Sequence, residues 1–414
     1  MMSEADYTSK VVDACQICGN GDLKSILSVG FLPPVNALRN IGERLSEEPS
    51  YPAELFFCDE CKLMQLGLVV NPKILFPVQY PYTSSTTKVL RENFKELYSE
   101  SSRLIDIARD DLVVDIGSND GNLLSNFKDY HQVLGITPEE IGKLAVARGI
   151  PTVFDYFHKG TVEYVKSNHG KAKIVTATNV FAHIDDVNHV TDLITDLLDD
   201  KGVFISESHY LYKLVQTLQY DTIYHEHLRY YSLESLINLF ERHDLEVFHA
   251  KDIPSHGGSI RVYAARKGDY QVNDSVKLVL EREKAFLTPE KFEDFRKDVV
   301  LSKINLYNLI KGVKTHGMRI YGIGAPSRAS TLINYVGLDE GIIDSVMEVP
   351  GSHKIGKYVP GTKIPIYEEA KLYQDQPEYA ILFSWHIADE LAPKLREKGY
   401  KGNFIVPLPE PRII

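Results

Sequence analysis

The chain has 414 residues, 43% hydrophobic and 25% charged, a length that predicts two or three domains with separate cores. Its formal net charge of −11 argues against nonspecific nucleic-acid binding, which needs a basic face. No apolar run reaches the roughly 20 residues of a membrane span, so no membrane partner is expected. The polar, acidic N-terminus is unlike a secretory signal, so we expect a cytoplasmic protein. No interface pattern fixes the assembly, and we expect a monomer or small homo-oligomer.

All four cysteines lie in the first 61 residues, as Cys15-x-x-Cys18 and Cys58-x-x-Cys61. Two such knuckles can offer four thiolates to one tetrahedral Zn²⁺ ion. Two disulfides or four free thiols are the alternatives, and disulfides are disfavoured in the cytoplasm. We predict a structural zinc site, because four Cys ligands leave no open position for chemistry. The surrounding residues, 12–70, are expected to form a loop-rich unit that the metal holds together.

Residues 72–88 contain three prolines and the pair Tyr80 and Tyr82. This stretch is either a plain connector or a lid over a neighbouring site. Beyond it, apolar runs alternate with helical stretches, which predicts a mostly parallel α/β sheet. Its strands are expected at 112–116, 132–136, 152–154, 173–177 and 202–206, with helices at 88–109 and 122–130. Two further strands, at 245–249 and 259–264, are expected to pair antiparallel.

A long amphipathic helix at 275–315 begins a second α/β unit of usual domain size. Its strands are expected at 341–346, 379–383 and 403–406. A Gly-rich turn near its start carries Gly324, Ser327 and Arg328 and resembles a phosphate-binding turn. A second dinucleotide site is unsupported, because no acid follows a clear next strand. Three domains follow, at 1–75, 76–270 and 271–414.

The turn Asp115-Ile-Gly-Ser-Asn-Asp-Gly121 stands where the first strand of the central sheet meets a helix. Glycines let the backbone approach a ligand, and a helix start offers free N–H groups. Asn119 replaces the middle glycine of the dinucleotide fingerprint, so a cofactor with an amino acid tail, S-adenosylmethionine, fits better. An ordinary strand–helix turn is the alternative. Cofactor contacts are expected from Asp115, Gly117, Ser118, Asn119, Gly121, Asn122, Thr137, Asp155, Tyr156, Phe157 and Asn179.

Thr137 stands where nucleoside-binding sheets often carry an acid for the ribose hydroxyls. Either Glu139 reaches the ribose instead, or Thr137 makes a weaker contact. Asn179 and His183 follow the fourth strand, whose carboxyl end should face the ligand crevice. A solvated helix cap is the alternative reading of Asn179.

The densest polar and aromatic stretch is Tyr224-His225-Glu226-His227. His227 can act as a base near neutral pH, Glu226 can fix its tautomer, and Tyr224 can donate to a developing oxyanion. His-x-His could also bind metal, but no partner ligands stand at a suitable spacing. A purely structural polar loop is the remaining alternative.

Taken in order, these blocks carry a resemblance that spans nearly the whole chain. The Cys knuckles, Tyr-x-Tyr-x-Ser-Ser, Asp-Ile-Gly-Ser-Asn-Asp-Gly, Asn-Val-Phe-Ala-His and Tyr-His-Glu-His-Leu-x-Tyr-Tyr-Ser are followed by Gly-Gly-Ser-Ile-Arg, Gly-Ala-Pro and Phe-Ile-Val-Pro-Leu-Pro. The sequence resembles the three-domain, S-adenosylmethionine-dependent C-methyltransferases of nucleotide-linked deoxysugars. This resemblance implies a zinc module, a Rossmann-like class I methyltransferase sheet and a C-terminal Rossmann-like α/β domain.

The resemblance also implies a substrate and roles for the matching residues. The substrate would be a 4-keto-6-deoxyhexose on a nucleoside diphosphate, methylated at C3. His227 would remove the proton beside the ketone, while Tyr224 and Glu226 orient sugar and enolate. Further sugar or nucleotide contacts would come from Tyr80, Tyr82, Asn179, His183, His225, Gly324, Ser327 and Arg328. The alternatives are a small-molecule O- or N-methyltransferase and an inactive, zinc-bearing binding protein.

Overall fold

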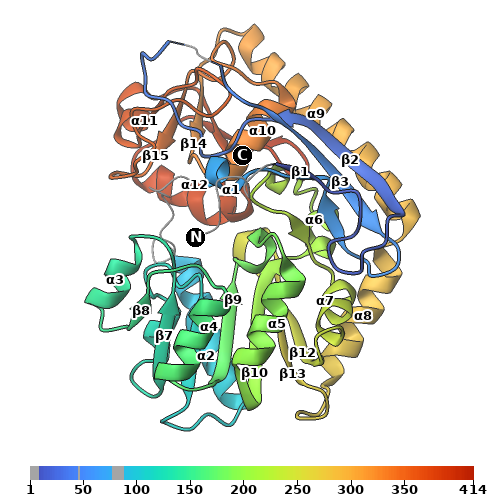
Figure 1. Ribbon diagram of the computed structural model, residues 1–414. Helices are drawn as coiled ribbons and strands as arrows, with labels where there is room; N and C mark the ends of the chain where they lie inside the picture. The colour runs from blue at the N-terminus through green and yellow to red at the C-terminus, as the bar shows by residue number, and fades with distance from the viewer. Residues whose placement is uncertain (1–8, 45–46, 77–87) are drawn as a thin grey trace.

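The computed structural model describes residues 9–44, 47–76 and 88–414. Three sheet-containing units surround a common centre (Figure 1), and the long helices α8 (Asp274–Phe286) and α9 (Pro289–Thr315) run along one edge. Among the described residues, no helix combines the length and apolar character needed to cross a bilayer. Tyr80 and Tyr82 lie outside the described residues. The domain boundaries at 75/76 and 270/271 stay predictions.

The central unit is built on a seven-stranded sheet of order β12-β13-β10-β9-β6-β7-β8. From β8 to β10 the strands run parallel, whereas β13 pairs antiparallel with both β10 and β12. This is the mostly parallel α/β sheet that the alternating apolar runs predict. The strands are β6 (Leu112–Ile116), β7 (Gln132–Ile136), β8 (Thr152–Val153), β9 (Ala172–Thr178), β10 (Leu198–His209), β12 (Leu245–Ile253) and β13 (Ser259–Arg266).

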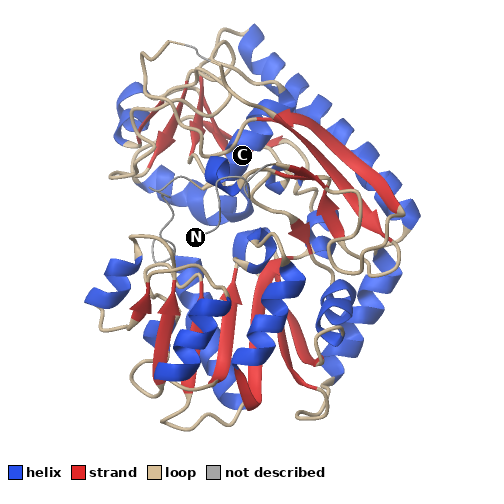
Figure 2. Ribbon diagram, in the orientation of Figure 1, coloured by secondary structure: helices blue, strands red, loops and turns tan. Residues whose placement is uncertain are grey.

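Helices cover both faces of this sheet (Figure 2). They are α2 (Lys88–Leu104), α3 (Gly142–Ala147), α4 (Lys159–Asn168), α5 (Val187–Leu197) and α7 (Leu233–Glu241), whereas α6 (Leu211–Gln216) packs with the N- and C-terminal units (Figure 1). The helix predicted at 122–130 is wrong, because only the short 3₁₀ turn η3 (Leu124–Asn126) forms there. Ser125 and Asn126 donate side-chain hydrogen bonds to Asn122 O at 2.7 and 3.0 Å. Such local side-chain bonds compete with the helical backbone pattern.

The N-terminal unit is a four-stranded antiparallel sheet of order β11-β4-β3-β2. Its strands are β2 (Leu23–Leu32), β3 (Tyr51–Cys58), β4 (Met64–Leu66) and β11 (Arg229–Tyr230), and β1 (Lys10–Val11) pairs with β5 (Leu68–Val69) beside α1 (Pro72–Leu75). The predicted loop-rich unit therefore also contains a sheet, which the sequence did not indicate. Two register shifts between β2 and β3 interrupt the inward alternation that would otherwise show in the sequence. The sheet packs on α9, where the Phe57 and Phe292 rings lie 4.7 Å apart.

The C-terminal unit begins with two helices rather than the single one predicted at 275–315. Pro289 cannot continue a helix, and Thr288 caps α9 by accepting a hydrogen bond from the Lys291 N–H. The six-stranded sheet that follows has the order β16-β15-β14-β17-β18-β19. Its strands are β14 (Ile320–Ile323), β15 (Ser345–Glu348), β16 (Ile366–Glu368), β17 (Tyr379–Leu382), β18 (Asn403–Val406) and β19 (Arg412–Ile413), with helices α10 (Ser327–Val336), α11 (Ala370–Asp375) and α12 (Ala388–Glu397).

The strand predicted at 341–346 is shifted to β15, because Ile342 and Ile343 form a turn onto Asp339 O. The chain order places a topological switch at β14, whose neighbours β15 and β17 are both parallel to it. Ligands of open α/β sheets bind outside the carboxyl ends of strands at such a switch. Residues after β14 and β17 contact the 3₁₀ turn η5 (Tyr220–Thr222) of the central unit. The switch therefore faces the Tyr-His-Glu-His segment.

Candidate active site

The predicted cofactor turn follows β6 and closes tightly on its surroundings. Gly117 has a φ of 72°, and a Cβ at this position would lie 2.4 Å from Val180 Cγ2. Gly121 has a φ of 76°, and a Cβ at this position would lie 2.8 Å from Ala145 Cβ of α3. Asn119 adopts a φ of 48°, which Asn tolerates better than most residues. Both glycines are thus required by conformation and by space.

Asp115, the penultimate residue of this strand, carries a buried carboxyl group. Thr176 Oγ1 donates a hydrogen bond of 2.6 Å to Asp115 Oδ1. Burial raises the pKa of Asp115 to about 7, with the nearby Glu207 adding to the effect. A cationic ligand group beside this carboxyl would restore its charge, as the ammonium of an amino acid tail can do.

Three predicted cofactor residues carry buried polar atoms that have no hydrogen-bond partner among the described residues. These are Ser118 Oγ, Asn122 Nδ2 and Asn179 Oδ1. Buried polar groups are normally paired, so such atoms indicate where a polar ligand binds. Asn179, at the carboxyl end of β9, has a φ of 57°, and its N–H donates to Glu207 O at 2.8 Å. The donor and acceptor set around this turn fits S-adenosylmethionine.

The ribose and adenine positions remain predictions. Thr137 is buried, and its hydroxyl accepts a long 3.5 Å hydrogen bond from the Glu139 N–H. Burial raises the pKa of the Glu139 carboxyl to about 7. After β8, Asp155 accepts hydrogen bonds from its neighbour Tyr156 N and contacts the His158 ring at 3.1 Å. Tyr156 is 66% exposed and Phe157 partly buried against the central core.

The Tyr-His-Glu-His segment lies where all three units meet. His227 Nδ1 lies 2.9 Å from Thr222 O, so this nitrogen carries the proton and donates to the carbonyl. The lone pair is then on Nε2, the nitrogen that can act as a base. Burial, reinforced by the neighbouring His183, holds the pKa of His227 well below its usual range. The imidazole is therefore neutral at physiological pH.

Aromatic and imidazole rings surround His227. Ring centroids lie at 4.1 Å for Tyr224, 4.4 Å for His209 and 5.1 Å for His183. Burial raises the pKa of Tyr224 well above its usual range, so its hydroxyl stays protonated and able to donate. Burial also lowers the pKa of His183 to about 4, and His183 Nδ1 is a buried atom without a partner among the described residues.

The other two residues of the motif bind the N-terminal unit. Asn36 Nδ2 donates to Glu226 Oε1 at 2.7 Å. His225 Nε2 lies 3.1 Å from Pro52 O, which orients this ring toward β3. The N-terminal unit thus fixes the position of the predicted catalytic segment.

The C-terminal residues reach the same centre. Gly324, with φ 77°, leaves β14, and Ser327 starts α10. Arg328 donates to both carboxylate oxygens of Asp221 at 2.9 and 3.0 Å, and Trp385 Nε1 donates to the same carboxylate at 2.7 Å. The Arg328 guanidinium is therefore already paired within the protein, and its predicted phosphate contact stays a prediction.

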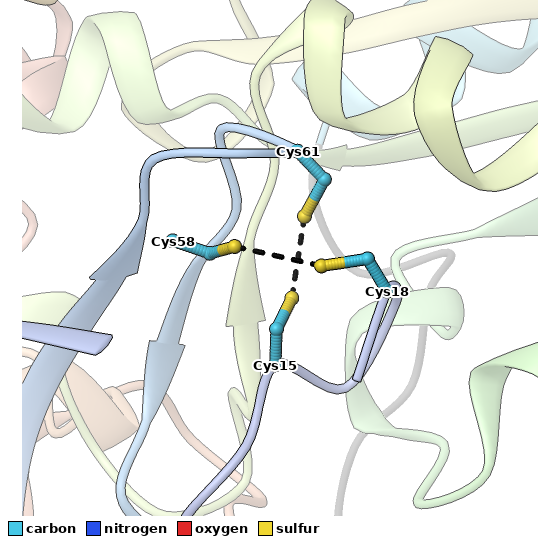
Figure 3. Close-up of side chains that lie close together, drawn as sticks. All are labelled: Cys15, Cys18, Cys58 and Cys61. Atoms are coloured by element: carbon cyan, nitrogen blue, oxygen red, sulfur yellow. Dashed lines mark hydrogen bonds between the residues drawn. The ribbon is translucent and has the colours of Figure 1, made fainter. Parts of the chain in front are cut away.

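The four cysteines converge on one point (Figure 3). Their Sγ atoms all lie within 4.8 Å of one another, with Cys15 and Cys61 at 3.2 Å and Cys18 and Cys58 at 3.6 Å. Tetrahedral zinc with Zn–S bonds of about 2.3 Å requires sulfurs about 3.8 Å apart. The donor set and its geometry fit Zn²⁺. Among residues 9–44, 47–76 and 88–414, His225 and His227 belong to no comparable ligand group.

The sequence reasoning missed several residues of the site. Asn36 stood in a stretch without a motif assignment, whereas Asp221 and His256 stood beside the Tyr-His-Glu-His and Gly-Gly-Ser-Ile-Arg blocks without a role of their own. His209 was missed because the strand was expected to end at residue 206, whereas β10 continues to His209. The rule that strand carboxyl ends face the crevice would have found it once the strand end was right.

Three family descriptions match consecutive parts of the chain. "Putative zinc binding domain" matches residues 15–76, "Methyltransferase domain" matches 89–250, and "C-methyltransferase C-terminal domain" matches 254–409. C-methyltransferase NovU of Streptomyces niveus is 32% identical over 409 residues, which are 97% of this chain and 97% of NovU. The chain belongs to the C-methyltransferase family. It is an S-adenosylmethionine-dependent enzyme that methylates carbon, and its N-terminal unit carries the zinc-binding cysteines.

Solved structures resemble parts of the chain more distantly. An S-adenosylmethionine-dependent methyltransferase from Clostridium acetobutylicum ATCC 824 is 13% identical, covering 44% of this chain and 94% of its own, with a TM-score of 0.34. Magnesium protoporphyrin IX methyltransferase (ChlM) from Synechocystis PCC 6803, with bound S-adenosylmethionine, is 12% identical, covering 43% of this C-methyltransferase and 78% of its own chain, with a TM-score of 0.31.

Proposed function

We propose that this C-methyltransferase acts at C3 of a 4-keto-6-deoxyhexose carried on a nucleoside diphosphate, with His227 as the base. The observation that carries the proposal is the hydrogen bond from His227 Nδ1 to Thr222 O at 2.9 Å. It fixes the tautomer that leaves Nε2 free to accept a proton. Because the ring is buried and neutral, the base is available without prior deprotonation.

A ketone acidifies the adjacent C–H, and the resulting enolate is a carbon nucleophile. Tyr224, whose hydroxyl stays protonated, can donate to the enolate oxygen. Glu226, held by Asn36, can orient the sugar. S-adenosylmethionine supplies the electrophilic methyl group, and Asp115, Ser118, Asn122 and Asn179 would hold it. Proton removal by a positioned base is worth roughly 10²–10⁴-fold in rate.

The substrate is proposed to span the central and C-terminal units. His183 and Asn179, which follow the carboxyl end of β9, would contact the sugar. Gly324, Ser327 and Arg328 lie at the switch point of the C-terminal sheet, where phosphate groups bind in related α/β folds. For the ribose of the cofactor, Glu139 and Thr137 are both candidates, because a carboxylate or a hydroxyl can accept a hydrogen bond from a ribose hydroxyl.

The test combines methylation with isotope exchange. Substrate deuterated at C3 should lose deuterium to water on incubation with the enzyme alone, and should gain a methyl on carbon when S-adenosylmethionine is added. His227→Asn should slow both by about 10²–10⁴-fold, while cofactor affinity in calorimetry stays near that of the wild type. His169→Asn, an exposed position after α4, is the matched control. Methyl on oxygen, or unchanged exchange in His227→Asn, would refute the proposal.

A further inference from the structure

A row of imidazoles continues outward from His227. The His209 ring lies 4.4 Å from the His227 ring with the planes tilted by 50°, so ring atoms of the two are in direct contact. His256 follows, with its ring centroid 5.9 Å from that of His209. His227 is buried, whereas His209 and His256 are partly exposed, and Pro254, two residues before His256, is exposed. The row therefore leads from the buried base toward solvent.

The outer ring is held in an unusual backbone conformation. His256 has a φ of 56°, in the left-handed region that costs a non-glycine residue roughly 1–3 kcal/mol. Gln219 Nε2 donates to Gly257 O at 2.7 Å, and Ser259 Oγ donates to Ser255 O at 3.1 Å, which together fix this turn. His256 Nε2 is a buried nitrogen without a partner among the described residues. Strain of this kind, with a buried unpaired ring nitrogen, points to a functional role.

Methylation of carbon releases the proton of the substrate C–H bond, and this proton has to leave the active site. The C–H bond breaks, and its electron pair forms the new C–C bond through the enolate. The S–C bond of the sulfonium breaks, and its electron pair stays on sulfur in the neutral thioether. One cation disappears and one proton appears, which balances the charge. If His227 is the base, that proton is on His227 Nε2 after each turnover.

The protonated state of His227 is unfavourable at this buried position and cannot persist. Burial and the positive charges nearby, including Arg328, hold the pKa of His209 well below its usual range and lower that of His256 to about 4. The Nδ1 edge of His227 is occupied by Thr222 O. Each of the three rings can therefore carry the proton only transiently, because its neutral form is strongly favoured.

We propose that His209 and His256 relay the proton from His227 Nε2 to solvent, which resets the base for the next turnover. This inference rests on the proposed function of His227. It assigns a role to two residues to which the proposed function gives none. Because they act through His227, their loss should affect proton exchange with water and repeated turnover more than the first methyl transfer.

The test uses 4-keto nucleotide sugar deuterated at C3, with the zinc-loaded full chain and without S-adenosylmethionine. A deuteron captured by His227 either returns to carbon or is lost to water, and only the relay makes the loss fast. His209→Asn should slow deuterium loss by about 10²-fold, at the lower end of the range for a positioned proton-transfer group. Added imidazole should restore the loss, which it cannot do for a merely structural defect. In rapid-quench experiments the first methylation should proceed at nearly the wild-type rate while later turnovers slow.

His256→Asn gives a second, milder variant in a surface turn, in case His209→Asn does not fold. Wild-type rates of deuterium loss in both folded variants, with His227→Asn inactive in exchange, would overturn the relay and leave the proposed function intact. An absence of deuterium loss in the wild type itself would overturn both.

Discussion

Arg328, at the start of α10, forms a buried two-point ion pair with Asp221 of η5, and the two side chains are 8% and 1% exposed. The pair joins the C-terminal switch point to the turn that precedes Tyr224 and His227. Trp385, the single tryptophan of the chain, donates to the same carboxylate at 2.7 Å. Its fluorescence therefore reports directly on this contact between the units.

Breaking the ion pair between Arg328 and Asp221 should strongly destabilise the folded protein. Arg328→Ala or Asp221→Ala leaves an uncompensated buried charge, and each should lower the free energy of unfolding by about 3–5 kcal/mol. Urea unfolding followed by Trp385 fluorescence measures this. Arg319→Ala breaks the pair with Glu378, which is 43% and 40% exposed, and should cost only about 0–1 kcal/mol. Equal losses in the two pairs would contradict the role of burial.

Zinc should be bound at one ion per chain and should be needed for the N-terminal sheet. The cysteine cluster packs with Leu63 and Ile17 against the central core, so its loss removes both a crosslink and buried surface. Mercurial titration of all four thiols should release one zinc, and chelation should lower the melting temperature. Cys58→Ser should lose the metal and most of the protein's kinetic resistance to proteolysis near β3. Four freely titrating thiols without chelator would rule the site out.

Substitution can show whether Gly117 of the cofactor turn is needed for the space around it as well as for its backbone conformation. Gly149 has a φ of 78° and open space at the Cβ position, so Gly149→Ala should cost about 1–2 kcal/mol from the backbone conformation. Gly117→Ala adds the 2.4 Å contact with Val180 to a similar φ. We expect a larger loss of stability and a loss of S-adenosylmethionine affinity, measured by calorimetry. Similar effects at both positions would show that the space at Gly117 is unimportant.

The sequence sufficed for features that depend on neighbouring residues. Short apolar runs predicted β6, β7, β9 and the C-terminal strands β17 and β18, and the cysteine spacing predicted the cluster that the structure brings together. Prediction from the sequence failed where local hydrogen bonds or bulges interrupted the expected helical or alternating pattern. Asn126 bonds backward to Asn122 and stops a helix, and bulges conceal the alternation of β2.

Contacts between units could not be predicted at all. Arg328 and Asp221 are 107 residues apart, and Asn36 and Glu226 are 190 apart. Nothing in the local pattern of either residue marks its partner, because the pairing is set by how three separate cores pack together. The same holds for His209 and His256, which meet only because β10 and β13 pair antiparallel, with His209 opposite Ser259.

The bond between Asn36 and Glu226 offers a test of how the zinc-bearing unit supports the site. Asn36→Asp keeps the shape but places a second carboxylate against Glu226, where like charges about 4 Å apart repel by about 4 kcal/mol at an effective dielectric of 20. We expect kcat to fall at least tenfold with little change in cofactor affinity. Asn40→Asp, beside Glu43 on the exposed part of the same unit, makes the same change and should be nearly silent. Equal losses would mean that the whole unit, rather than this contact, is disturbed.

Asp115 should make cofactor affinity depend on pH in a defined direction. Burial raises its pKa to about 7 in the free protein, so the group is largely protonated and neutral below that pH. Only the carboxylate attracts the ammonium of the cofactor tail, and binding should therefore tighten as pH rises from about 5.5 to 7, by at most tenfold per pH unit, and then level off. Calorimetry with S-adenosylhomocysteine, which has the same tail without the sulfonium charge, measures this dependence.

Two substitutions make the pH effect specific to Asp115. Asp115→Asn should bind more weakly and lose the dependence, because no carboxyl group titrates there. Thr176→Val removes the 2.6 Å hydrogen bond that favours the charged form, so it should raise the pKa of Asp115 further and move the rise in affinity to higher pH. A flat affinity across this range in the wild type, or an unshifted curve in Thr176→Val, would place the tail of the cofactor away from Asp115.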